Sequence, residues 1–329
     1  MDKQLIRKIV KAFEIKPGEL VLLQFWGEEE DRQVLHEFSY ELAAEGAIPL
    51  EMQHSRAFYK NLFERMDKLI FDDKYFTIFQ NVDAVIDLCM YTPVLPHKNF
   101  SSDKMGLYRE YMQKLFQILM GKEKFIQLRV PTKTNALEAG LAPEVFISHM
   151  TAAYDIDYGR LKAEAAALIQ ELKFKESIVI TTGNGCELTL NIRERKWYSD
   201  TGTGDMPCGE IYIAPAEYVA EGKLYMDRLY LEDIILDKVT LVFQAGKLTD
   251  SDSETVIEFL KTLPENGNVL CEFGIGMNEN VRELCGYTVL DEKRKNSYHV
   301  AIGANNMFGG NIDSRSHIDF VFQGDVVFK

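Results

Sequence analysis

The sequence has few cysteines and no pattern that would pair them. Its 329 residues include five cysteines, at positions 89, 186, 208, 271 and 285, and no C-x-x-C pair occurs. The number is odd, and most of these cysteines stand inside apolar stretches, so the sequence argues against a disulfide framework. We expect buried thiols in a reducing cytoplasm.

Basic charge is scarce relative to acidic charge. Lys and Arg number 37 against 51 Asp and Glu, which gives a formal net charge of -14. Binding to polyphosphates needs a basic surface, so this balance argues against nucleic acid and anionic membranes as partners. No apolar run is long enough to cross a bilayer, and the charged, amphipathic N-terminus lacks the apolar core of a signal peptide. We therefore expect a cytoplasmic protein.

The glycine pattern of a dinucleotide site is also missing. No G-x-G-x-x-G follows the first apolar stretch, residues 20–26. The turn that does follow, Gly-Glu-Glu-Glu-Asp at 27–31, is acidic and would repel a pyrophosphate. A dinucleotide-binding function therefore has little support.

The first half of the chain alternates between helical and strand-like segments. Apolar residues recur at helical spacing in 3–15, which ends before Pro17 and Gly18, and in 29–47. Short apolar stretches predict strands at 19–26, 48–53, 82–91 and 124–130. Strands that alternate with helices are typical of a parallel sheet covered on both faces. We predict an α/β N-terminal domain with a mostly parallel sheet over residues 1–168.

The pattern changes after a long helical segment at 157–177, which we interpret as a connector. Short strands and glycine turns follow, and Gly183-Asn184-Gly185 predicts a hairpin. Helical spacing returns at 252–263, and 278–285 is a second candidate helix. We predict a strand-rich α+β C-terminal domain over residues 169–329, with its boundary uncertain by roughly ten to fifteen residues.

Histidine is rare as well, and one of the six stands beside an aspartate near the C-terminus. The stretch His317-Ile-Asp-Phe-Val-Phe322 alternates as a strand does. Side chains at i and i+2 share a face, so His317 and Asp319 point one way while Ile318 and Phe320 point the other. Such a pair suits a metal ion. Taken alone, the pair is better explained as an exposed strand face or as a histidine oriented by its aspartate.

Three further residues extend this pattern. Glu272 interrupts the apolar stretch 268–276, and a buried carboxylate is costly unless it is paired, hydrogen-bonded or bound to metal. His299 opens another apolar stretch, and Glu210 begins one after Pro207 and Gly209. Each has an ordinary interpretation as a solvated or core residue. Together the two histidines and three carboxylates have the composition of a hydrolytic metal centre, although their spacing cannot prove that they converge.

Four segments carry a resemblance to a known family. They are Met206–Pro215, Cys271–Asn278, Asp291–Asn311 and Ser316–Phe322. In this order they resemble the aminopeptidase T / aminopeptidase S type of thermophilic metallo-aminopeptidases, and the likeness runs through the whole chain. The chain looks like a short, divergent member. The resemblance implies a hydrolase that removes N-terminal residues from peptides, acts through two divalent ions such as Zn, Co or Mn, and forms a homodimer.

Carried over by position, the metal ligands of the family fall on Glu210, Glu272, His299, His317 and Asp319. The resemblance implies that the two ions activate a water and polarise the scissile carbonyl, and that one ion holds the free substrate amine. Glu210 and Glu272 are candidates for bridging the ions or for proton transfer. The residues do not decide between these roles, so no general base is assigned.

One position departs from the family. The segment Asn305-Asn-Met-Phe-Gly-Gly310 has Phe308 where the family has a tyrosine, and phenylalanine cannot donate a hydrogen bond to a developing oxyanion. Tyr287 and Tyr298 are close in sequence, but nothing in the sequence shows that either replaces it. Two alternatives therefore stay open. One is a ring-opening dioxygenase with a single iron on His299, His317 and Asp319. The other is a catalytically impaired relative that binds peptide or metal.

Overall fold

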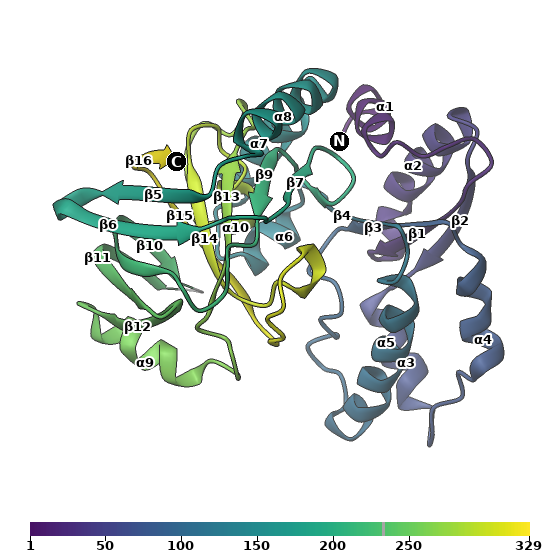
Figure 1. The fold of residues 1–329 in the computed structure, drawn as a ribbon. Coiled ribbons are helices and arrows are strands. Elements are labelled where there is room, and N and C mark those ends of the chain that lie inside the picture. Colours follow the sequence, from purple (N-terminus) through teal and green to yellow (C-terminus); the bar gives the residue numbers. More distant parts are fainter. Residues whose placement is uncertain (232–233) are drawn as a thin grey trace. The chain divides into compact units, whose positions relative to one another are not determined.

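The chain folds into two compact units, seen here in a computed structural model that describes residues 1–231 and 234–329 (Figure 1). The first unit holds Met1–Asp155 and Gly202–Pro207, and the second holds Ile156–Thr201 and Cys208–Lys329. The segment 157–177 forms helix α8 (Tyr158–Leu172), which lies wholly within the second unit. The domain boundary near residue 168 stays a prediction.

The first unit is built on a parallel sheet, as the alternation of strands and helices predicts. Its strand order is β2-β1-β3-β4-β8. The strands are β1 (Leu20–Trp26), β2 (Ile48–Gln53), β3 (Ala84–Cys89), β4 (Lys124–Arg129) and β8 (Asp205–Met206). All four pairings in this sheet are parallel. The short edge strand β8 comes from a distant part of the chain, and nothing in its sequence predicts it.

Helices cover both faces of this sheet (Figure 1). The helices of this unit are α1 (Lys3–Ala12), α2 (Arg32–Ala44), α3 (Arg56–Glu64), α4 (Asp73–Thr77), α5 (Met105–Leu119), α6 (Lys133–Glu138) and α7 (Pro143–Tyr154), with 3-10 turns η1 (Glu29–Asp31), η2 (Ile78–Asn81) and η3 (Ser102–Lys104). Helix α1 begins at Asp2, whose carboxylate accepts a hydrogen bond from the Leu5 amide. Right-handed crossovers from β1 to β2 and from β2 through β3 to β4 place α2 on one face and α3 and α5 on the other.

The second unit contains two antiparallel sheets. The first has the order β12-β11-β10-β6-β5-β16. Its strands are β5 (Ser177–Thr182), β6 (Cys186–Asn191), β10 (Glu221–Leu231), β11 (Ile234–Gln244), β12 (Lys247–Ser251) and β16 (Asp325–Phe328). The predicted hairpin is confirmed, because β5 and β6 pair across the turn η4 (Gly183–Gly185), where Asn184 has a φ of 59°.

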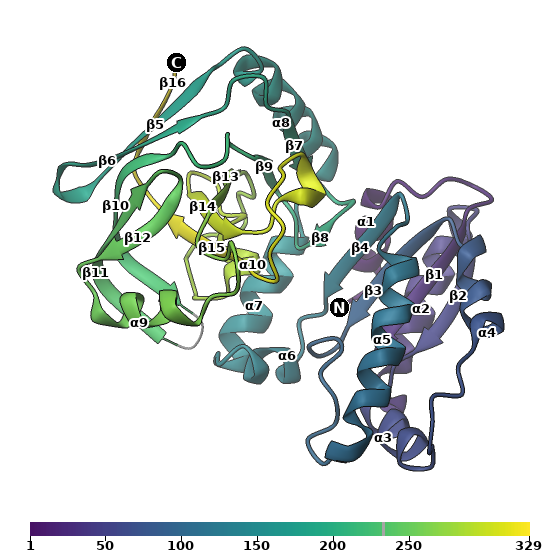
Figure 2. The same cartoon turned by 60° about the horizontal axis from the view of Figure 1, so that its bottom comes forward.

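The other antiparallel sheet carries the candidate site. Its order is β15-β14-β13-β9-β7, and Figure 2 shows β13, β14 and β15 side by side. The strands are β7 (Trp197–Asp200), β9 (Glu210–Ile213), β13 (Leu270–Gly276), β14 (Tyr298–Gly303) and β15 (His317–Phe322). The unit also contains α8, α9 (Glu254–Thr262), α10 (Thr288–Asp291) and the 3-10 turn η5 (Asn306–Phe308). The fold class predicted from the sequence, an α/β first part followed by a strand-rich part, is confirmed.

One of the two helices expected late in the chain is absent. The helix expected at 252–263 is α9, but residues 278–285 are not helical. The backbone amides of Cys285 and Gly286 instead donate hydrogen bonds to the Asp291 carboxylate. Capture of these amides by a side chain favours a turn over continued helix.

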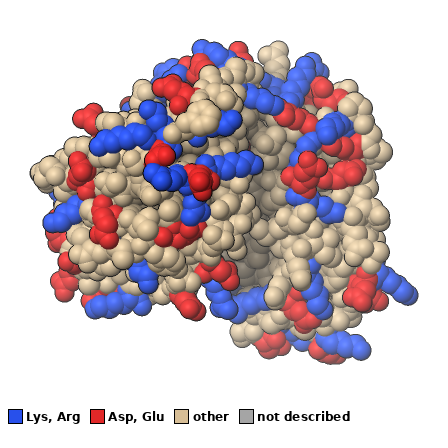
Figure 3. All heavy atoms as spheres, in the orientation of Figure 1, with Lys and Arg blue, Asp and Glu red and all other residues tan. Residues whose placement is uncertain are grey.

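No helix within residues 1–231 and 234–329 is long and apolar enough to cross a membrane. On the face drawn in Figure 3, acidic and basic side chains are interspersed.

Candidate metal centre

Strand register places all five predicted ligands on one face of the sheet formed by β7, β9, β13, β14 and β15. Residues directly opposite in antiparallel strands share a face. Glu210 of β9 is opposite Gly276 of β13. Glu272 lies four residues before Gly276 on β13, and residues an even number apart in a strand share a face. On β14, His299 is opposite Gly274 of that same face. The five candidates are thus brought together from four strands.

The last strand completes the arrangement. On β15, Asp319 is opposite Ala301 and His317 is opposite Gly303, and both partners share the face of His299. The opposite face carries Ile211, Phe273 and Val300, which are fully buried apolar residues. The sheet therefore turns one side to an apolar core and the other to the candidate site. The predicted shared face of His317 and Asp319 is confirmed.

Small residues leave room for the functional side chains. Gly274 stands opposite His299, and a Cβ atom on Gly274 would come within 2.0 Å of the imidazole Cε1 and 2.1 Å of Nε2. The histidine ring therefore lies directly over this glycine. The pairing of β13 with β14 also shifts register between Leu270 and Glu272, and such a bulge re-aims the side chain that follows it.

The ligand atoms lie close to one another. His299 Nε2 is 3.3 Å from Glu272 Oε1 and 3.6 Å from Glu210 Oε2. His317 Nε2 is 3.4 Å from Glu272 Oε2 and 3.5 Å from Asp319 Oδ1. The two oxygens of Glu272 thus face two different histidines.

The hydrogen bonds of His317 favour the tautomer that a metal needs. Its Nδ1 lies 2.8 Å from the Ala304 carbonyl oxygen, which can only accept a hydrogen bond. Nδ1 therefore carries the proton, and Nε2 is left to face Glu272 and Asp319. A histidine that donates from one ring nitrogen to a carbonyl is oriented to bind metal through the other.

Two residues of the site were missed by the sequence analysis. Glu292 follows α10, and its carboxylate lies with the His299 imidazole and the Asp319 carboxylate in a group whose ligand atoms are all within 4.8 Å of one another. Lys293 is 1% exposed, and its Nζ is 2.5 Å from Glu210 Oε1 and 2.7 Å from Glu292 Oε1. The only signal in the sequence is the charged run Asp291–Arg294, which normally predicts a solvated turn.

Burial and a surplus of carboxylates shift the proton affinities of this cluster. Burial raises the pKa of Glu272 and raises the pKa of Glu292 to about 8. Burial acts to lower the pKa of His299, but the Glu272 hydrogen bond and the nearby carboxylates outweigh it and raise the pKa to about 9. Burial also acts to lower the pKa of His317, but the hydrogen bond to Asp319 outweighs it and raises that pKa. Without metal, the cluster therefore holds extra protons.

These residues fit a divalent ion. The cluster contains four carboxylates, those of Glu210, Glu272, Glu292 and Asp319, and Lys293 pairs with two of them, Glu210 and Glu292. Glu210 Oε2 is buried and has no hydrogen-bond partner among the described residues. A buried carboxylate oxygen with no donor, beside imidazole nitrogens and further carboxylates, suits a cation such as Zn²⁺, Co²⁺ or Mn²⁺. Metal binding would release the protons that the histidines hold.

The other four histidines do not join this centre. His54 is buried in the first unit, where it hydrogen-bonds to Gln24 and Tyr59. His36 lies near Glu51, and His97 accepts a hydrogen bond from the Asn99 amide. His149 lies on α7 of the first unit. Their interpretation as structural or surface residues agrees with these positions.

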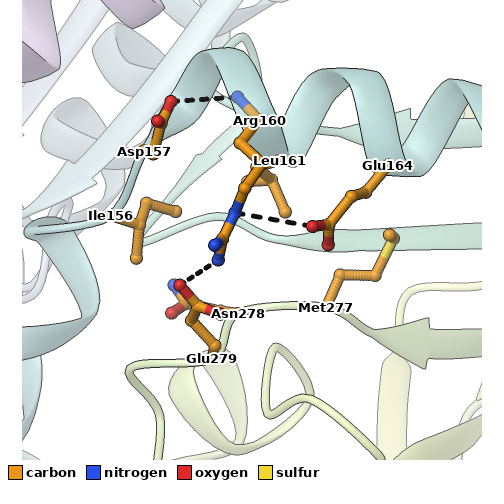
Figure 4. A pocket seen from close by; sticks show the side chains of 8 residues that line it. All are labelled: Ile156, Asp157, Arg160, Leu161, Glu164, Met277, Asn278 and Glu279. Carbon is orange, nitrogen blue, oxygen red and sulfur yellow. Dashed lines mark hydrogen bonds and ion pairs between the residues drawn. The ribbon is translucent and has the colours of Figure 1, made fainter.

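A separate pocket lies between α8 and the segment after β13 (Figure 4). At its centre Arg160 forms ion pairs with Glu164, at 3.4 Å, and with Glu279. Histidine and cysteine are absent from the residues that line it, which are Ile156, Asp157, Arg160, Leu161, Glu164, Met277, Asn278 and Glu279. Glu164 and Glu279 pair with Arg160, and Asp157 caps helix α8, so this lining leaves no free set of ligands for a second metal.

Comparison with known proteins agrees with this geometry. The sequence profile of the thermophilic metalloprotease (M29) family matches residues 11–319. The chain belongs to this family. It is therefore a metallopeptidase by family, and the resemblance seen in the sequence segments is confirmed. Membership in a family of metalloproteases implies a divalent metal.

A solved structure extends the comparison to the fold. Wild-type AmpT from Thermus thermophilus is similar with a TM-score of 0.63 and 14% sequence identity, over 99% of this chain and 97% of that chain. At this identity the likeness concerns the fold. No match was found among curated proteins.

Proposed function

We propose that the protein is a metal-dependent aminopeptidase that removes N-terminal residues from peptides with a water activated by two divalent ions. The observation that carries this proposal is the gathering of Glu210, Glu272, His299, His317 and Asp319 on one face of a sheet. When bound, divalent ions supply a water with a pKa near 7 and polarise the scissile carbonyl. Zn, Co and Mn are the expected ions because the donors are imidazole and carboxylate.

Two ions are favoured over one by the placement of Glu272. Its Oε1 faces His299 and its Oε2 faces His317, so this carboxylate would offer one oxygen to an ion held beside each histidine. On the His299 side, Glu210 and Glu292 are additional donors. Asp319 lies 3.5 Å from His317 Nε2 and also in the group with His299 and Glu292, so it is a donor available beside both histidines. A mononuclear iron site on His299, His317 and Asp319 would leave these glutamates without a role.

Lys293 restricts what Glu210 can do. Its ammonium group donates to Glu210 Oε1, so only Oε2 of that carboxylate faces His299. We therefore assign Glu210 as a ligand through Oε2 alone. Buried Lys293 also offsets part of the negative charge in the cluster, which lowers the cost of burying the carboxylates before metal arrives.

The first test is metal content together with peptide hydrolysis. Protein purified without chelator or affinity metal should hold about two ions of Zn, Co or Mn per chain. It should release N-terminal residues from an aminoacyl-peptide panel. About one iron per chain would favour the dioxygenase instead, and full metal loading without hydrolysis of any aminoacyl substrate would exclude the peptidase.

A matched pair of histidine variants tests the site itself. His317→Ala should lower kcat/KM by at least about 100-fold, because it removes an expected ligand. His36→Ala is the control, since the two side chains are similarly exposed, at 33% for His317 and 35% for His36. The control should keep wild-type activity. Both variants should unfold near the wild-type temperature when measured without metal.

The cellular setting belongs to the same proposal. We propose a peptide substrate, a homodimer and a cytoplasmic location, which the resemblance implies and the composition favours. Light scattering after size exclusion checks the dimer, and cell fractionation checks the location.

A further inference from the structure

The position of Phe308 leaves a gap in the proposed chemistry. Its ring stands edge-on to the His317 imidazole, with the centroids 6.0 Å apart and the planes at 85°. Asn305 fixes this segment, because its side chain donates to the Cys271 carbonyl and accepts from the Ile312 amide. The phenylalanine is therefore held beside an expected ligand, where it offers no hydrogen-bond donor.

Tyr212 brings a phenol next to the Phe308 ring from another strand. It lies two residues after Glu210 on β9, so the two side chains share a face. It is directly opposite Gly274, which in turn is directly opposite His299. The His299 ring lies over Gly274, so the imidazole extends toward β9 and Tyr212.

Tyr212 also touches Phe308 directly. Their rings meet edge to face, with centroids 5.4 Å apart and planes at 84°. Tyr212 is only partly buried, and among the residues that the structure describes none forms a hydrogen bond with its hydroxyl. The Tyr212 phenol, whose hydroxyl is free to donate, is thus in contact with the Phe308 ring, which has no hydroxyl.

We propose that Tyr212 supplies the phenol that Phe308 lacks, as a hydrogen-bond donor to the oxygen that gains negative charge when the peptide carbonyl is attacked. This inference rests on the proposed aminopeptidase function. Donors aimed at such an oxygen typically contribute about 100-fold to 1,000-fold in rate. The Phe308 departure is then a relocation of the donor and not a loss of activity.

Tyrosines closer in sequence do not meet these conditions. Tyr298 precedes His299 on β14 and therefore points to the apolar face, where its ring stacks on Phe273 with centroids 5.9 Å apart. Tyr287 lies before α10 and outside the strands of this sheet. Tyr198 of β7 stacks on Tyr212, with centroids 5.8 Å apart, but it stands one strand further from His299.

Exchange of the two aromatic residues provides the test. Three variants, Tyr212→Phe, Phe308→Tyr and the double exchange, are compared with Tyr198→Phe as the control, each loaded with cobalt and checked for equal metal content. We expect Tyr212→Phe to lower kcat by about 100-fold with KM changed less than about twofold. The double exchange should restore kcat to within about tenfold of wild type, and Tyr198→Phe should change it less than about twofold.

A second measurement separates this inference from the proposed function. An aminoalkyl phosphonate peptide mimics the tetrahedral oxyanion, and its binding to the cobalt-loaded proteins is followed by calorimetry. Tyr212→Phe should weaken this binding by about 10-fold to 100-fold, and the double exchange should recover it.

The outcomes can be told apart. If the wild type hydrolyses peptides but Tyr212→Phe leaves both kcat and phosphonate affinity unchanged, this inference fails while the proposed function stands. If no peptide is hydrolysed, the proposed function fails, yet a phosphonate affinity that depends on Tyr212 would still support the donor. Metal-loaded wild type that does not bind the phosphonate would overturn both.

Discussion

At the scale of single residues, the candidate centre depends on a glycine. Gly274 has no side chain, and the His299 imidazole occupies the space where one would be. On its other side Gly274 is paired with Tyr212 of β9. A residue with no chemistry of its own therefore determines where a ligand and a proposed donor can stand.

Gly274→Ala tests this dependence. The new methyl group would overlap the His299 ring, which must swing away from Glu272 and Glu210. We expect metal affinity to fall by at least about 10-fold, as it does when the support of a metal ligand is lost. Calorimetric titration with manganese measures it.

The control for this substitution is Gly106→Ala on α5. A Cβ atom at Gly106 would have nothing within 4 Å, so metal affinity should not change. Alanine in a helix should raise the free energy of unfolding by up to about 1 kcal/mol. Wild-type metal affinity in Gly274→Ala would show that His299 does not need its observed position.

The site residues that the sequence predicts stand out from their neighbours in the chain, and the residues that it does not predict resemble theirs. Glu272 and His299 interrupt apolar strands, so each one stands out. Glu292 and Lys293 belong to a charged run that would ordinarily lie in solvent. Their burial depends on the turn after α10 reaching the sheet face, which is a tertiary contact and leaves no local pattern. Tyr212 was missed for a similar reason, because an aromatic residue in a strand is expected in a core.

At the scale of secondary-structure elements, the first unit contains a buried polar chain that spans its central strands. Gln24 of β1 donates to Asp87 Oδ1 of β3 at 2.6 Å. The side-chain oxygen of Gln24, Oε1, therefore accepts a hydrogen bond from His54 Nε2, 2.9 Å away. His54 Nδ1 is left to accept a hydrogen bond from the Tyr59 hydroxyl. This pattern requires a neutral imidazole. Burial agrees, because it lowers the pKa of His54 from 6.5 to about 3.

This histidine makes stability depend on pH. The pKa of His54 is 6.5 in the unfolded chain and about 3 in the folded state. The free energy of unfolding that depends on neutral His54 is therefore complete above pH 6.5 and decreases as the pH falls toward 3. Between pH 6.5 and about 5, the loss should be about 2 kcal/mol. His54→Gln keeps one donor and one acceptor without a titrating group. Urea unfolding at several pH values should show the wild type losing about 2 kcal/mol more than the variant between pH 6.5 and about 5, because the other titrating groups, such as Asp87, are present in both. Equal pH dependence would exclude His54 as the cause.

The elements themselves were largely predictable, and the exceptions have physical reasons. Strands β1 to β4 are apolar and flanked by amphipathic helices, so local pattern and final fold agree. Strand β8 is two residues long and joins the sheet only through its pairing with β4. Residues 278–285 show helical spacing, but the Asp291 carboxylate captures the amides of Cys285 and Gly286. Strand β8 thus depends on a partner strand that is distant in the chain, and the turn at 278–285 depends on a side chain, so local spacing predicts neither.

At the scale of the whole molecule, the two compact units do not follow the order of the chain. Residues 202–207 belong to the first unit, although the segments on both sides of them belong to the second. Sequence patterns report local periodicity, and an excursion of six residues into another unit leaves too short a signal.

The placement of the ligands predicts that metal stabilises one unit selectively. All candidate ligands lie in the second unit. A ligand that binds only the folded state at about 100 times its Kd raises the free energy of unfolding by about 2.7 kcal/mol. The chain has two tryptophans, and each unit holds one of them, Trp26 in the first and Trp197 in the second. Each reports on its own unit.

Single-tryptophan variants make the measurement. Trp197→Phe leaves Trp26, which is buried and stacks on His54, and Trp26→Phe leaves Trp197, which is buried against Phe273. Fluorescence during urea unfolding, with and without manganese, should show the Trp197 transition move to higher urea while the Trp26 transition stays in place. Equal displacement of both would mean that the units unfold together, and displacement of the Trp26 transition alone would place the metal in the first unit.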